Sequence, residues 1–106
     1  MSSDAVTTPP TVLCTSHTGE PVELSLDCST FGFEPMTIVH FTKSRLNGRV
    51  GLVRGTSGGM LWFALFPSAE AAALPEALAA PVQTTSCRGR EELIRQYGWM
   101  IHDGAV

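Results

Sequence analysis

The feature of the sequence that most constrains the fold is the stretch from Met36 to Phe66. Runs of β-branched and aromatic residues alternate there with two short segments, Asn47-Gly48 and Thr56 to Gly59, whose residues tolerate positive φ angles. Such segments join neighbouring strands, and Asn-Gly favours a type I′ turn. The stretch therefore predicts three consecutive antiparallel β-strands, which we interpret as the centre of a small barrel.

The N-terminal part of the chain predicts two more strands around a hairpin loop, in which Gly19 suits the left-handed position. In the second of them apolar and polar residues alternate, which is the period of a strand with one buried face. Gly51 indicates a bulge or a sharp bend that would let a small barrel close. The predicted strands are Thr11 to Thr15, Pro21 to Leu26, Met36 to Thr42, Val50 to Gly55 and Met60 to Phe66.

Helical signals are concentrated in the C-terminal third. Ser68 is placed to cap an alanine-rich helix, and Pro75 interrupts that run and suits the first position of a second turn. A later helix has three apolar residues on one face and ends at Gly98. The predicted elements are helical turns from Ser68 to Leu74 and Pro75 to Ala80, a closing strand from Val82 to Cys87, a helix from Gly89 to Gly98, and a last strand or loop from Trp99 to His102.

The length of 106 residues predicts a single domain, with residues 11–102 forming the globule, 1–10 a flexible tail and 103–106 a frayed end. The N-terminus lacks the basic and apolar regions of a signal peptide. The longest uninterrupted apolar run in the most apolar window, Met60 to Phe66, is far shorter than the about 20 residues that span a bilayer. We expect a soluble intracellular protein, cytoplasmic or nuclear, with no membrane partner.

The net charge of −3 argues against a protein that coats nucleic acid through its overall field. Four of the seven basic residues nevertheless form a basic segment, Lys43, Arg45, Arg49 and Arg54. If these side chains point the same way, they could bind RNA or DNA phosphates. The alternative explanation, which we favour, is that they protect exposed strands from edge-to-edge aggregation.

The residues suited to catalysis or metal binding do not form a recognisable pattern. The three cysteines have no CxxC spacing, which favours a reducing compartment over a disulfide framework, and the three histidines lack metal-ligand spacing. Cys87 precedes Arg88-Gly89-Arg90 at the predicted start of a helix, where positive charge and the helix dipole would lower its thiol pKa. A small cysteine-dependent enzyme is therefore a third hypothesis. We expect no catalytic residues, no metal and no cofactor.

The segment from Leu46 to Gly55 resembles the KOW-type motif of SH3-like barrels. The likeness rests on a turn glycine, a basic residue, a second glycine and a valine, here Gly48, Arg49, Gly51 and Val53. The resemblance implies a five-stranded barrel that docks onto RNA or onto other proteins within larger assemblies. The chain departs from that pattern in its acidic total charge and its helical C-terminal third.

These observations predict an α+β protein, a small antiparallel SH3-like β-barrel with one or two short helices in the C-terminal third. The function that we expect is a non-enzymatic interaction module that binds a protein partner through barrel loops, as a subunit of a larger assembly. Sparse charge and the apolar strand Met60 to Phe66 also agree with a homo-oligomer. Because aromatic residues dominate binding hot spots, the partner-binding candidates are Phe31, Phe33, Trp62 and Trp99.

Overall fold

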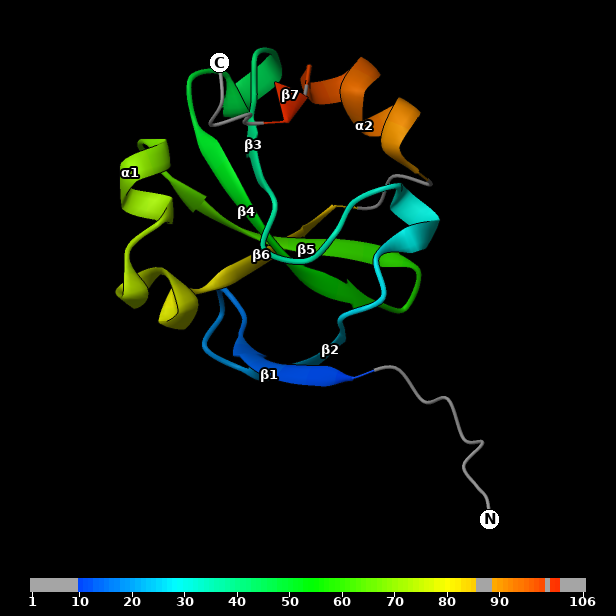
Figure 1. The fold of residues 1–106 in the computed structure, drawn as a ribbon, viewed down its shortest axis with the longest axis vertical. Helices are drawn as coiled ribbons and strands as arrows, with labels where there is room; N and C mark the ends of the chain where they lie inside the picture. The colour runs from blue at the N-terminus through cyan, green and yellow to red at the C-terminus, as the bar shows by residue number, and fades with distance from the viewer. Residues whose placement is uncertain (1–9, 86–88, 99, 102–106) are drawn as a thin grey trace.

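The computed structural model describes residues 10–85, 89–98 and 100–101. Its strands form one antiparallel sheet, with short helices inserted between them and concentrated in the C-terminal third, as predicted (Figure 1). The strands are β1 (Thr11–Thr15), β2 (Pro21–Ser25), β3 (Ile38–His40), β4 (Val50–Ser57), β5 (Met60–Phe66), β6 (Val82–Thr85) and β7 (Met100–Ile101). The helices are α1 (Ala69–Ala72) and α2 (Arg90–Tyr97), and the 3₁₀ turns are η1 (Ser29–Phe31), η2 (Ser44–Leu46) and η3 (Pro75–Ala79).

The long strand β4 is the centre of the sheet. One of its edges pairs with β5 along its whole length, and the other pairs first with β3 and then, at Thr56, with β2. The hairpin of β1 and β2 extends the sheet at one end, while β6 pairs with β5 and β7 with β3. An isolated bridge between Ser16 and Val82 links the β1 end to β6, and a single bridge does not close the sheet into the predicted barrel.

The two predicted turns of the central stretch are present, but only one has the expected geometry. Gly58 and Gly59 have φ angles of 62° and 77°, as in a type I′ hairpin turn. Asn47 has a φ of −56° and a ψ of 130°, and Gly48 a φ of 87°, which is a type II turn rather than the expected type I′. The reason is that η2 precedes this turn, so it ends a longer connection instead of joining two strands directly.

The predicted bulge at Gly51 is wrong, because Gly51 lies in regular register between Val39 of β3 and Leu65 of β5. A Cβ atom at Gly51 would lie 2.8 Å from two ring carbons of Phe41, so the glycine makes room for that ring. The register of β4 against β5 shifts instead between Val53 and Gly55, which leaves Arg54 as the bulged residue. The resulting irregularity changes which way the Arg54 side chain points.

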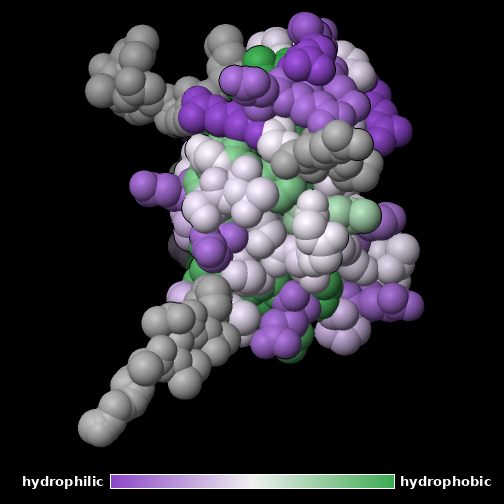
Figure 2. Space-filling view, turned by 90° about the vertical axis from the view of Figure 1, so that its right-hand side faces the viewer, coloured by the Kyte–Doolittle hydropathy of each residue, from purple (hydrophilic) through white to green (hydrophobic). Residues whose placement is uncertain are grey.

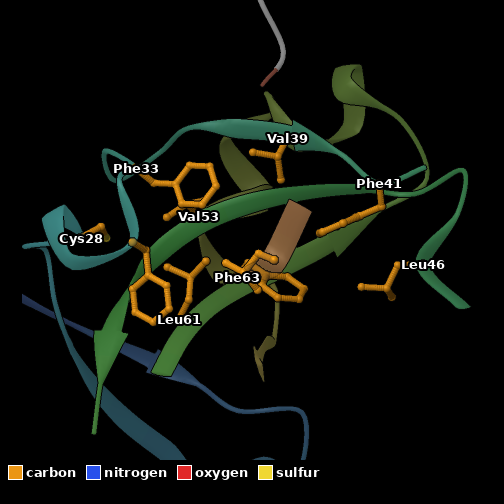
Figure 3. Packing of buried hydrophobic residues seen from close by; sticks show 10 residues of the cluster. Cys28, Phe33, Val39, Phe41, Leu46, Val53, Leu61 and Phe63 are labelled. Atoms are coloured by element: carbon orange, nitrogen blue, oxygen red, sulfur yellow. The ribbon is translucent and has the colours of Figure 1, made fainter. Parts of the chain in front are cut away.

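Alternation along β4 and β5 gives the sheet two buried faces. The larger core cluster packs against η1 and α2, and Figure 3 shows Phe33, Phe41, Val53 and Phe63 converging within it. On the opposite face, Val50 and Leu52 of β4 pack against α1 and η3. A third cluster lies between the β1–β2 hairpin and the sheet and contains Cys14, Leu24, Ala64 and Val82.

Local sequence explains the helical elements. The Ser68 side chain accepts a hydrogen bond of 3.2 Å from the amide of Ala71 and caps α1, and Pro75 begins η3. Gly98, with a φ of 65°, ends α2 by donating its amide to the Ile94 carbonyl at 2.6 Å. No helix among the described residues has the length and apolar character required to cross a bilayer.

Candidate functional site

Two of the four aromatic residues proposed as partner-binding anchors are buried. Phe31, at the end of η1, and Phe33, which follows that turn, are only 1% and 5% exposed because both belong to the larger core cluster. The Arg90 guanidinium lies 5.4 Å from the centre of the Phe33 ring and covers it. These two residues are therefore excluded as exposed anchors. Trp62 is partly buried against the third cluster, and Trp99 lies outside the described residues.

The basic segment is divided between the surface and the interior. Lys43, Arg45 and Arg49 are exposed on the connection between β3 and β4, but Arg54 is only 6% exposed. Lys43 Nζ donates to the Arg95 carbonyl of α2 at 3.1 Å, so Lys43 lies beside that helix. Figure 2 shows hydrophilic side chains gathered at the end of the molecule where α2 lies. The condition that all four side chains point the same way is not met.

Exposed apolar side chains gather at a different place. Of the six large hydrophobic residues exposed in the described part of the chain, Met36, Leu74 and Leu78 line one depression of about 210 Å³. We call it the apolar groove, and it runs between β3 and β4 on one side and the α1–η3 segment on the other. Its walls include Met36, Ile38, Leu52, Ala72, Leu74 and Leu78.

The elements that flank the apolar groove place its rim residues in the open. Met36 occupies the third position of a turn closed by a 3.3 Å hydrogen bond from the Thr37 amide to the Glu34 carbonyl. Its φ of 70° fits the type II turn for which glycine is the usual residue. On the other side, Ala72 and Ala77 are buried against β4, which leaves Leu74 and Leu78 outside.

Arg54 lies directly behind the wall of the apolar groove. Its Nη1 contacts Met36 Sδ at 3.2 Å, and its Nη2 contacts the Leu78 carbonyl at 3.4 Å and Cys14 Sγ at 3.7 Å. The buried Nε atom has no hydrogen-bond partner. Within the part of the chain that the structure describes, no carboxylate forms an ion pair with this guanidinium. A cation that cannot lose its charge is thus buried against one carbonyl and two sulfur atoms.

A wider hollow of about 470 Å³ lies between η1 and the first part of α2. Arg90, Glu91, Glu92 and Arg95 line it together with the backbone near Gly32. Its lining mixes both signs of charge and therefore favours no class of ligand. It is also next in sequence to residues 86–88, which are outside the described ranges.

Burial limits the reactivity of the two described cysteines. Cys14 and Cys28 are buried free thiols, and burial, aided by the negative charge of Asp27, raises the pKa of Cys28. A raised pKa makes a thiol a poorer nucleophile at neutral pH. No three metal-ligating side chains meet among the described residues. The candidate Cys87 lies outside them.

Sequence reasoning missed the apolar groove. Leu74 and Leu78 are four residues apart, but Leu74 precedes η3 with an extended backbone, so helical spacing gave no signal for the groove. The other wall comes from Met36, Ile38 and Leu52, which the fold brings alongside.

Comparisons with protein-family models, with curated proteins and with solved structures found no match to this chain.

Proposed function

We propose that the protein is a non-enzymatic interaction module that binds a peptide segment of a partner protein in the apolar groove. The observation that carries this proposal is the clustering of Met36, Leu74 and Leu78, half of the exposed large hydrophobic residues described, around one depression. Contiguous apolar surface on a soluble domain commonly marks an interaction site. The expected binding surface thus moves from the barrel loops to the turn at Met36 and the α1–η3 segment.

The size and lining of the apolar groove suit single apolar side chains of a peptide better than a whole drug-sized molecule. Pockets for drug-sized molecules hold about 300–1,000 Å³, whereas this groove holds about 210 Å³. A space of that size suits one or two apolar side chains of a partner. Their burial would supply most of the binding free energy, at about 25 cal/mol per Å² of apolar surface removed from water.

We also retain the SH3-like barrel as a proposal about the architecture. The bridge between Ser16 and Val82 supports it, because that bridge brings the β1 end of the sheet next to β6. The bulge at Arg54 supports it as well, since bulges increase the twist and bend of a strand.

The proposed function is tested with a peptide array probed by the purified protein, followed by NMR mapping of the selected peptides. We expect selected peptides to contain an apolar side chain and to shift the resonances of Met36, Leu74 and Leu78. Leu78→Ser should weaken binding at least tenfold, because it removes apolar surface from the rim.

Leu13→Ser is the matched control for that substitution, since Leu13 is 70% exposed on β1 and is not part of the groove. Equal losses in the two variants, or resonance shifts confined to another face, would contradict the proposal.

A second candidate is RNA or DNA binding, favoured by the exposed Lys43, Arg45 and Arg49. Fluorescence anisotropy with labelled oligonucleotides tests it across a salt titration. Binding that falls with salt and is lost in the Arg45→Ala/Arg49→Ala variant would support this function. No binding at low salt would leave the three residues as surface charge.

A further inference from the structure

We propose that the apolar groove recognises the C-terminus of its partner: Arg54 pairs with the terminal carboxylate while the groove holds the last, apolar side chain. The inference rests on the proposed function and specifies the class of ligand. Four observations support it, namely the burial of Arg54, the absence of a partner carboxylate among the described residues, its place behind the groove and the backbone features that put it there.

Arg54 is a buried cation that has no carboxylate partner among the described residues. The side chain is 94% buried, its Nε has no partner, and no described carboxylate pairs with it. A guanidinium does not deprotonate in proteins, so it cannot relieve this burial by becoming neutral. Buried charges are normally paired, and an unpaired one is strongly unfavourable. A bound anion would supply the missing partner.

The Arg54 guanidinium lies beside the apolar groove. Both Met36 and Leu78, which the guanidinium contacts, line the groove and are about half exposed, at 49% and 48%. Arg54 does not itself line the groove, so a ligand seated between Met36 and Leu78 reaches the guanidinium when the Met36 side chain moves aside. Met36 is the more adaptable of the two, because a methionine side chain is unbranched and has three rotatable bonds. We expect its side chain to change rotamer when the carboxylate enters.

Both Arg54 and Met36 occupy irregular positions of the backbone. Arg54 occupies the bulge of β4, and Met36 has a positive φ in a position that glycine usually takes. Bulges redirect side chains and occur often beside functional sites, and strained residues cluster at ligand clamps. Here the two irregularities face each other, since their side chains are in contact at 3.2 Å.

A carboxylate is the anion that best matches the charge of this site. Arg54 is the cation behind the groove, and no basic residue is among those that line it. One guanidinium matches a carboxylate, which carries one charge and accepts two parallel hydrogen bonds. A phosphate group carries about −1.5 to −2 at neutral pH and would leave negative charge without a partner in an apolar site.

A C-terminal carboxylate fits better than an acidic side chain. The last residue of a chain carries its carboxylate and its side chain on the same Cα atom. An apolar last residue thus presents both groups within one residue. An acidic side chain would sit on a neighbouring residue, whose Cα is 3.8 Å away, and both residues would have to enter a groove of about 210 Å³.

The test uses fluorescence polarisation with the full-length protein and short labelled peptides that end in leucine. The first peptide has a free carboxylate, the second is its C-terminal amide, and the third is an amide with glutamate before the leucine. We expect the free acid to bind about 10- to 100-fold more tightly than the amide, as for a hydrogen bond to a charged group. Tighter binding of the third peptide would assign the carboxylate to a side chain and overturn the proposal.

The variant Arg54→Met should lose the preference for the free acid. It should bind the acid and the amide equally, which is the result of a double-mutant cycle for a direct pair. The matched control Arg49→Met removes an exposed cation and should keep the full preference. An unchanged preference in Arg54→Met would overturn the proposal.

Urea unfolding checks that Arg54→Met is folded, which we expect because the substitution removes an unpaired buried charge. If it does not fold, Arg54→Lys replaces it, since lysine keeps the charge but loses the planar fork. This variant should reduce the preference for the acid, and a full preference would contradict the proposal. Equal binding of acid and amide by the wild type, with Leu78→Ser still weakening both, would overturn the inference and leave the proposed function standing. Binding of no peptide would overturn both.

Discussion

Cys28 illustrates how a single residue couples the core to pH. Its thiol is buried in the larger core cluster, and burial, with a smaller contribution from the Asp27 charge, raises its pKa above the ordinary value. The Asp27 carboxylate in turn accepts hydrogen bonds from the hydroxyl and the amide of Ser29, which lower the pKa of Asp27. The neutral thiol is therefore the form that the folded state prefers.

This preference predicts a loss of stability at high pH. The unfolded chain releases the Cys28 proton near its ordinary pKa of about 8.5, whereas the folded chain retains it to a higher pH. The unfolded state then binds fewer protons, so the free energy of unfolding falls as pH rises through this interval. The contribution of Cys28 is complete below the unfolded pKa and is lost as pH passes the folded one.

Urea unfolding of the wild type and of Cys28→Ala between pH 7 and about 10 measures this effect. The variant has a lower stability at pH 7 because it leaves a cavity, but its stability should fall less steeply with pH. Parallel curves for the two proteins would show that other groups cause the decline.

At the scale of elements, α2 is attached to the sheet through its C-terminal end. The amides of Thr42 and Lys43 both donate to the Tyr97 carbonyl at 2.9 Å, and Thr42 Oγ1 donates to the Gly98 carbonyl at 2.7 Å. Leu93 packs into the core from the same helix. The connection after β3 and the end of α2 thus hold each other in place.

Gly98→Ala should therefore destabilise the protein by about 2–4 kcal/mol, since both strain and a steric clash apply. The φ of 65° disfavours a side chain, and an added Cβ atom would overlap Thr42 Oγ1 and lie 3.2 Å from Thr42 Cβ. Urea unfolding measures the change.

Gly48→Ala is the matched control for Gly98→Ala. Gly48 also has a positive φ, of 87°, but nothing lies within 4 Å of the position of its Cβ atom. It should lose only about 1 kcal/mol, the strain contribution alone. Equal losses at the two glycines would refute the steric contact as the reason for Gly98.

At the scale of the whole molecule, stability should be unequal between the sheet and the wall of the apolar groove. The strand β4 is paired on both edges and buried on both faces. In contrast, α1 has four residues, and η3 is a 3₁₀ turn in which only Ala77 is buried. Elements with few buried residues open at low free energy.

We therefore predict that the backbone amides of Leu52 and Val53 exchange with solvent much more slowly than those of Ala72 and Ala73. A peptide bound in the apolar groove should slow exchange in α1 and η3 selectively, because opening would then require its release. Hydrogen exchange followed by NMR measures both effects. Protection in α1 equal to that of β4 would contradict this view.

Predictions from sequence succeeded where short-range chemistry decides the structure. The β1–β2 hairpin, the Gly58-Gly59 turn, the Ser68 cap and the end of α2 at Gly98 all follow from neighbouring residues. Predictions from sequence failed where a distant contact decided. The role of Gly51 depends on the Phe41 ring, and the burial of Phe31 and Phe33 depends on how η1 folds onto the sheet.

The sequence alone determined the α+β class and the approximate positions of strands and helices, because periodicity, turn glycines and helix caps act over a few residues. The interior position of Arg54 could not be read from local patterns, since the direction of its side chain depends on a bulge in the pairing of β4 with β5. The apolar groove also depends on the fold, because Met36 and Ile38 of one wall precede Ala72 of the other by more than thirty residues, and Leu52 precedes it by twenty. Contacts between residues that are distant in sequence depend on tertiary packing, which local sequence patterns do not specify.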